Sequence, residues 1–89
     1  METRVAIIGI IIEDKNSVEQ INSVLHDNNE YIIGRMGIPY RERNISVMSI
    51  VIDAPQDVIN TMSGRIGKIP GVSAKTAYSN VITKAVNNE

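Results

Sequence analysis

Two nearly unbroken apolar runs constrain the fold of this chain more than any other feature. They are residues 4–13 (RVAIIGIIIE) and residues 44–53 (NISVMSIVID). Both alternating sets of positions are apolar in each run, a pattern that by itself does not separate a buried strand from a buried helix. The density of Ile and Val, the short length and the interior Gly9 favour strands. Strands that are apolar on both sides are expected at the centre of a sheet, covered on both faces.

Each apolar run is followed by a helical pattern, with apolar residues at intervals of three and four. The first helix is predicted over residues 17–28, with Asn16 as its N-cap and Glu19 as the capping-box partner. Its apolar stripe consists of Val18, Ile21, Val24 and Leu25. The second helix is predicted over residues 55–66, with Gly67 as its C-terminal cap. Its stripe consists of Val58, Ile59, Met62 and Ile66.

Two more segments are predicted to be edge strands. Residues 30–39 contain two glycines and a proline, which predicts an irregular, bulged strand at a sheet edge. Residues 72–79 alternate between apolar and polar side chains, as in a half-exposed edge strand. Residues 40–43 form a charged hairpin loop between two strands. Residues 80–89 are expected to be a C-terminal tail that forms a short helix against a neighbour or frays.

The predicted order is therefore β-α-β-β-α-β. This is the ferredoxin-like α+β pattern, an antiparallel four-stranded sheet in the order 4-1-3-2 with two helices on one face. The chain of 89 residues reads as one domain, residues 1–79, followed by the tail. A domain this small buries only about 60–65% of the surface that its unfolded chain exposes. Without cysteines it has no disulfides to support it. The uncovered sheet face would be an apolar patch, so we expect a homo-oligomer, either a dimer or a tetramer, that buries it.

Composition excludes several classes of function. The net charge of −1 argues against a direct nucleic-acid binder, and no apolar run is long enough to span a membrane. We expect no cofactor and no metal site, because the chain has no cysteine and a single histidine, His26, which is expected on a helix surface. No catalytic constellation is recognisable, so we do not expect an enzyme. A cytoplasmic location is the default expectation.

Residues 31–43 (YIIGRMGIPYRER) are the strongest functional candidate. Arginines near a hairpin can hold a carboxylate or phosphate through paired hydrogen bonds, and glycines allow a ligand or backbone to come close. In the alternative reading, the arginines form ion pairs between subunits and the glycines form a bulge. The candidate ligand-binding or interface residues are Gly34, Arg35, Gly37, Tyr40, Arg41 and Arg43.

Three segments also carry a resemblance to a known family. Residues 4–14 (RVAIIGIIIED), 30–43 (EYIIGRMGIPYRER) and 51–79 (VIDAPQDVINTMSGRIGKIPGVSAKTAYS) resemble the iron-only hydrogenase system regulator family. Its members are small ACT-like, ferredoxin-fold proteins. More distantly, the chain is similar to the regulatory domain of nickel-responsive repressors, but it lacks the Cys and His ligands of such a metal site. The resemblance implies an ACT-like fold, a cytoplasmic location and a regulatory role, and it supplies no ligand.

These observations lead to two hypotheses for function. The first is an oligomeric regulatory protein of a hydrogenase system that senses a small anionic ligand at a subunit interface near Arg35 to Arg43. The second is a structural or interaction module that oligomerises and binds a protein partner without a small ligand. A DNA-binding repressor ranks third, because we expect no room for a helix-turn-helix or ribbon-helix domain before Arg4 or after Ser79. DNA contact would then need a second protein, and direct nucleic-acid binding is not expected.

Overall fold

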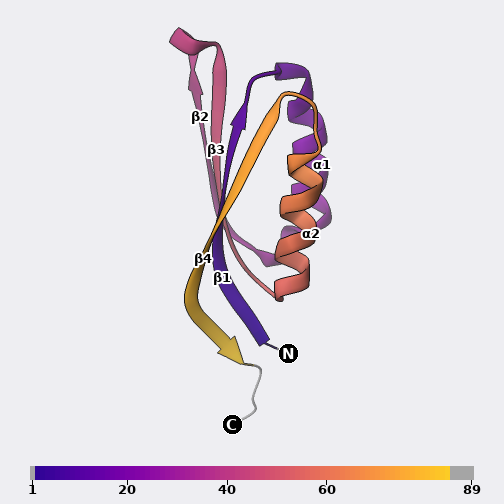
Figure 1. Ribbon diagram of the computed structural model, residues 1–89, viewed down its shortest axis with the longest axis vertical. Coiled ribbons are helices and arrows are strands. Elements are labelled where there is room, and N and C mark those ends of the chain that lie inside the picture. The colour runs from indigo at the N-terminus through magenta and orange to yellow at the C-terminus, as the bar shows by residue number, and fades with distance from the viewer. Residues whose placement is uncertain (1, 85–89) are drawn as a thin grey trace.

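The computed structural model describes residues 2–84 and has the predicted topology (Figure 1). The elements in chain order are β1 (Glu2–Ile12), α1 (Val18–Asp27), β2 (Ile32–Tyr40), β3 (Ile45–Ala54), α2 (Gln56–Gly67) and β4 (Val72–Lys84). The sheet order is β2-β3-β1-β4, which is the predicted order 4-1-3-2 read from the other edge. Neighbouring strands are antiparallel throughout. The ferredoxin-like α+β prediction is therefore confirmed.

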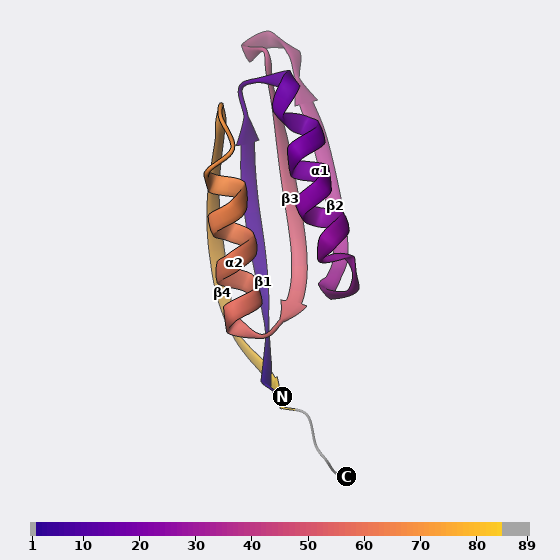
Figure 2. The same cartoon turned by 90° about the vertical axis from the view of Figure 1, so that its right-hand side faces the viewer.

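The two helices lie side by side on one face of the sheet. In Figure 1 the sheet is seen nearly edge-on and both helices are on the same side of it. Figure 2 shows α2 over the β4–β1 half of the sheet and α1 over the β3–β2 half. No helix within residues 2–84 is long and apolar enough to cross a membrane. The opposite face of the sheet carries no covering element among the described residues.

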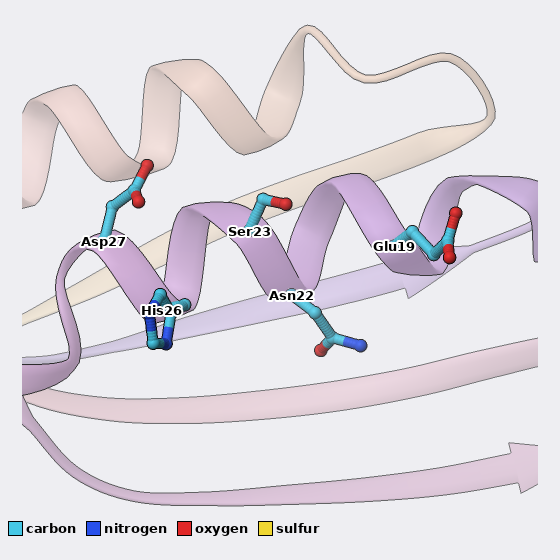
Figure 3. A pocket seen from close by; sticks show the side chains of 5 residues that line it. All are labelled: Glu19, Asn22, Ser23, His26 and Asp27. Carbon is cyan, nitrogen blue, oxygen red and sulfur yellow. The ribbon is translucent and has the colours of Figure 1, made fainter.

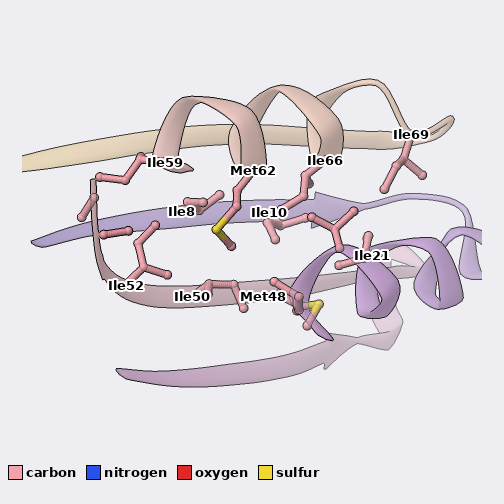
Figure 4. Packing of buried hydrophobic residues seen from close by; sticks show 14 of the residues in the cluster. Ile8, Ile10, Ile21, Met48, Ile50, Ile52, Ile59, Met62, Ile66 and Ile69 are labelled. Carbon is pink, nitrogen blue, oxygen red and sulfur yellow. The ribbon is translucent and has the colours of Figure 1, made fainter. Parts of the chain in front are cut away.

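The core fills the space between the sheet and the helices (Figure 4). Side chains at alternate positions of β1 and β3 point toward the helices, as the two-residue period of a strand requires. They meet the apolar stripes of α1 and α2, which gives an aliphatic core without Phe or Trp. Its fully buried large residues include Ile8, Ile10, Ile21, Leu25, Ile50, Ile52, Ile59, Met62 and Ile66.

The helix ends differ in detail from the predictions. A short 3-10 turn, Lys15–Ser17, precedes α1, and its cap is Asp14, whose carboxylate accepts a hydrogen bond of 2.9 Å from the Asn16 backbone N–H. The prediction of Asn16 as the N-cap was wrong, because the helical segment begins with the 3-10 turn at Lys15 and Asp14 caps it. Gly67 does not adopt a left-handed C-terminal cap either. The left-handed glycine is Gly71 (φ 72°), in the turn before β4.

Strand β4 runs on to Lys84, past the predicted end at Ser79. Residues 80–84, predicted as the start of a tail or short helix, instead pair with the beginning of β1, so that Arg4 lies opposite Ile82 and Glu2 opposite Lys84. The extension follows an irregularity at which Ser79 Oγ donates to the Val5 carbonyl at 2.6 Å. The rest of the predicted tail lies outside the described residues.

Strand β2 is an edge strand, as predicted from its glycines and proline. Its register against β3 shifts between Ile32 and Gly34, where one extra residue is accommodated. The bulge leaves Ile33 63% exposed. Bulges bend an edge strand and make it a poorer template for further strand addition.

Candidate functional site

The structure separates the six predicted site residues into different groups. Alternation along β2 places Arg35 and Gly37 on the helix side of the sheet, opposite buried Ile50 and Met48 of β3. Gly34 and Tyr40 belong to the opposite, open side. Neighbours in the sequence of a strand point to opposite faces. The six residues therefore cannot form one site within a single copy of the chain.

Arg35 has a defined partner on the helix side. Its guanidinium donates a hydrogen bond of 3.0 Å to the side-chain oxygen of Asn22 on α1. Both side chains are exposed, so this contact ties the edge strand to the helix above it only weakly. Arg35 is consequently occupied by a contact within its own chain, and it lies away from the hairpin end where the other two arginines are found.

Arg41 and Arg43 lie in the turn between β2 and β3. The turn is a 3-10 segment, Arg41–Arg43, and it ends at Asn44 in a left-handed conformation (φ 53°). Asn tolerates this conformation better than most residues because its side chain can bond to the local backbone. The turn lies at the same end of the sheet as the link from β1 to α1 (Figure 1). Lys15, a basic residue of that link, therefore lies at the same end of the molecule as Arg41 and Arg43.

These two segments enclose a pocket of about 320 Å³, here called the hairpin pocket. Two of its lining residues, Lys15 and Arg41, are basic, and none is acidic. Polar groups of Asn44 and Ser46 complete the wall. The full lining is Lys15, Pro39, Arg41, Asn44, Ile45 and Ser46. Two cations with no acidic residue in the wall suit a carboxylate or phosphate.

A smaller apolar pocket of about 170 Å³ adjoins the hairpin pocket. The two share Pro39 and Ser46 in their walls. The lining of the smaller pocket is otherwise aliphatic apart from Gly37, and consists of Ile12, Val18, Gly37, Ile38, Pro39, Ser46, Val47 and Met48. Together the two pockets offer a charged end and an apolar end, which fits a small anion that carries a short hydrocarbon part.

Sequence reasoning singled out Arg41 but not Lys15, the other basic residue in the lining of the hairpin pocket. The signal was available in the predicted topology, because in a βαββαβ sheet the end of the first strand and the turn between the second and third strands meet at one end. Lys15 follows shortly after the end of β1 at Ile12, and Arg41 is the first residue of the turn after β2. Arg43, also predicted, lies in the same turn but does not line the hairpin pocket.

The outer surface of α1 carries a wider hollow of about 550 Å³ (Figure 3). All its lining residues come from this one helix, and in Figure 3 their side chains point in different directions rather than toward a common centre. The hollow contains His26 and Asp27, but no group of three or more residues of metal-binding type is found within residues 2–84. Asp27 is engaged by Arg65 of α2 at 3.1 Å. The hollow is an open helix surface.

The open face of the sheet is the second candidate site. It is defined by the residues of the four strands that point away from the helices, and its centre is apolar. The exposed fraction is 44% for Ile7, 37% for Ile11 and 59% for Met36. Contiguous exposed apolar side chains of this kind mark interaction surfaces. Its members between Val5 and Ala77 are Val5, Ile7, Gly9, Ile11, Gly34, Met36, Ile38, Tyr40, Ile45, Val47, Ser49, Val51, Asp53, Ser73, Lys75 and Ala77.

Comparison with known proteins gives one family and several similar structures. Residues 4–76 match the model of the TM1266-like family, described as "Iron-only hydrogenase system regulator, putative". The solved structure of the uncharacterized protein TM1266 from Thermotoga maritima is similar, with 34% sequence identity and a TM-score of 0.82 over 85% of this chain and 96% of that one. No protein with a curated description matches.

A more distant likeness concerns the fold alone. A formyltetrahydrofolate deformylase from Pseudomonas putida KT2440 superposes with a TM-score of 0.63 at 11% sequence identity. The match covers 86% of this chain but only 29% of the deformylase chain. A shared fold at such low identity carries no information about activity.

Proposed function

Because the chain belongs to the TM1266-like family of iron-only hydrogenase system regulators, we propose that it is a ligand-responsive regulatory module and not an enzyme. It binds a small anion in the hairpin pocket, assembles with identical copies through the open face, and passes its ligand state to a protein partner. The observation that carries the ligand part of this proposal is that Lys15 and Arg41 line one pocket whose lining contains no acidic residue.

The ligand class follows from the walls of the two adjoining pockets. Arg41 offers a planar set of donors that suits carboxylate and phosphate oxygens, and Lys15 adds a compact positive charge. The neighbouring aliphatic pocket favours a ligand with a short apolar part. A small carboxylate or phosphate ester meets both requirements. Because the pocket is exposed to solvent, its affinity for the anion should fall as salt is added.

The position of the hairpin pocket suggests how ligand and assembly are coupled. Its lining residue Ile45 is half-buried and belongs by register to the open face, opposite Tyr40. An anion held between Lys15 and Arg41 would restrain the hairpin relative to the start of α1. The same restraint would order Tyr40 and Ile45 at the margin of the open face. Binding and assembly would then favour each other, as linked equilibria require.

The test measures the thermal shift of the purified, untagged protein with two probes, inorganic phosphate and succinate. We expect the midpoint of unfolding to rise with probe concentration, and Arg41→Ala and Lys15→Ala each to reduce the apparent affinity about tenfold, as loss of a charge-assisted contact does. Arg43→Ala is the matched control, because it removes the same charge from the same turn but not from the pocket wall.

Two outcomes would count against this assignment. If Arg43→Ala weakens binding as much as Arg41→Ala, general charge at the hairpin is responsible and the pocket is not the site. If neither probe shifts the unfolding midpoint, the anion class is wrong. Native mass spectrometry of the untagged protein adds an independent view, because it reports the number of copies and any small molecule that purifies with them.

A second candidate function is an interaction module that needs no small ligand. The exposed apolar residues of the open face favour it, since they would suit a protein partner as well as a second copy. An assembly of several copies without any bound small molecule, insensitive to both probes, would support this second function over the first. A protein that stays monomeric at micromolar concentration would contradict the role that both give to self-association.

A further inference from the structure

The open face carries two opposite charges in an otherwise apolar and small-residue surface. Alternation in β3 places Asp53 on this side, because its neighbours Ile52 and Ala54 are fully buried beneath the helices. Lys75 of β4 is on this side as well, because the next residue, Thr76, bonds to Ser63 of α2 on the helix side. Between Val5 and Ala77, no other open-face residue of the described strands is charged.

One oxygen of the Asp53 carboxylate, Oδ1, is buried without a hydrogen-bond partner. A buried carboxylate oxygen without a donor is costly, and native proteins nearly always supply one. Lys75 of the same chain cannot do so, because it is two strands away and four residues along the sheet, roughly 16 Å by standard strand spacings. No other open-face residue between Val5 and Ala77 is a cation, so none of these residues supplies that charge from within the chain.

The register of the sheet shows how a second copy could supply it. Lys75 lies beside Gly9 on one flank of β1, and Asp53 lies beside Val5 on the other flank. Ile7 is therefore midway between the two charges. Two such sheets can face each other across a two-fold axis that lies between them. If this axis passes over Ile7 and is perpendicular to the line that joins the two charges, it exchanges the positions of the two charges. It places Lys75 of each copy over Asp53 of the other.

We propose that two copies of this chain pack their open faces together about such an axis, joined by two reciprocal Lys75–Asp53 ion pairs across a centre formed by Ile7. A two-fold interface must be complementary to itself, and this arrangement satisfies both charges with one operation. Two small residues that pair across β1 and β3, Gly9 and Ser49, lie next to the axis and let the sheets come close. The strands of the two copies then cross steeply, in the manner of orthogonally packed sheets.

This inference rests on the proposed self-association through the open face and gives it a geometry. The test uses charge reversal. Lys75→Glu leaves two acidic groups on the face, and Asp53→Lys leaves two basic ones, so each variant alone should lose self-association by at least tenfold. When the two variants are mixed, every charge finds an opposite one, and a one-to-one complex should form. Native mass spectrometry distinguishes the mixed pair from either homodimer by mass.

The outcomes separate this geometry from self-association in general. Formation of the mixed pair, with both single variants monomeric, supports the geometry. If the single variants associate like the parent protein, while Ile7→Asp abolishes association, the open face is the interface but this pairing is wrong. If the parent protein itself is monomeric, both the pairing and the proposed self-association are overturned.

A second set of variants covers the case in which Asp53→Lys does not fold. Asp53→Asn and Lys75→Met each remove one charge with little change in size, and circular dichroism checks their folding. If the two residues pair across the interface, each change weakens association severalfold, and the double variant is hardly weaker than either single one. Independent, multiplying effects in the double variant would overturn the pairing.

Discussion

Strand β1 presents isoleucines to both faces of the sheet, but the two sets have opposite surroundings. Ile8 and Ile10 are fully buried beneath the helices, whereas Ile7 is 44% and Ile11 37% exposed. The residue type is the same, so hydrophobicity alone does not decide which side is covered. The connections decide it, because both crossovers of this topology carry their helices to the same side. One face is closed by the chain itself, and under our proposal a second copy covers the other.

The largest difference between the two faces should appear when a single isoleucine is shortened on each. Ile8→Ala creates a cavity in the closed core and should lower the free energy of unfolding by about 2–5 kcal/mol. Ile7→Ala on the open face should cost about 1 kcal/mol or less in the separated monomer. Urea denaturation at several protein concentrations measures both. The effect of Ile7→Ala should grow with concentration, and equal costs at high dilution would contradict the contrast.

A smaller effect is expected at the turn between α2 and β4. Gly71 has φ 72°, and a Cβ atom added to it would lie 2.6 Å from the Cβ of Asp14. Gly71→Ala should therefore lower the free energy of unfolding by about 1–3 kcal/mol through backbone strain and this clash. Gly64→Ala on α2, where nothing lies within 4 Å, is the control and should not destabilise. Thermal unfolding measures the stability of both variants, and equal stability of the two would contradict this prediction.

The smallest effect is expected from the link between the two covering helices. Arg65 of α2 and Asp27 of α1 form an ion pair of 3.1 Å, with side chains 45% and 56% exposed. Solvent screens such a pair, so Arg65→Gln should change the free energy of unfolding by less than about 0.5 kcal/mol. A loss above 1 kcal/mol in chemical denaturation would show that the helices depend on this contact rather than on the core beneath them.

The sequence predicted the closed face of the sheet, but it did not indicate which side chains share a pocket or a surface. Strand and helix periods are local, so the apolar runs and stripes could be read residue by residue, and the order of elements then implied the sheet. The extension of β4 to Lys84 could not be read this way. Its residues are partly polar, and they form a strand because the beginning of β1 offers unpaired backbone groups. That is a pairing between distant segments, which local pattern does not reveal.

The candidate site shows the same limit. Residues 31–43 were identified as a functional stretch, but neighbours on a strand face opposite sides, so Arg35 and Gly34 lie on different surfaces. The hairpin pocket combines Arg41 with Lys15, which is remote in sequence. Asp53 and Lys75 likewise come from different strands, and only their register with β1 shows that they lie on the two flanks of the same strand. Composition could identify charged residues but could not place them on one surface.

The pairing of β1 with β4 has a consequence for the order in which the molecule forms. Glu2 lies opposite Lys84, so this strand pair joins residues from the two ends of the described chain. Closing so long a loop carries a larger entropy cost than closing the short turn between β2 and β3. Pairings between distant residues also slow folding. The hairpin should therefore form early and β4 should dock late. Because β4 carries Lys75, the proposed pairing of two copies would become possible only at the last step of folding.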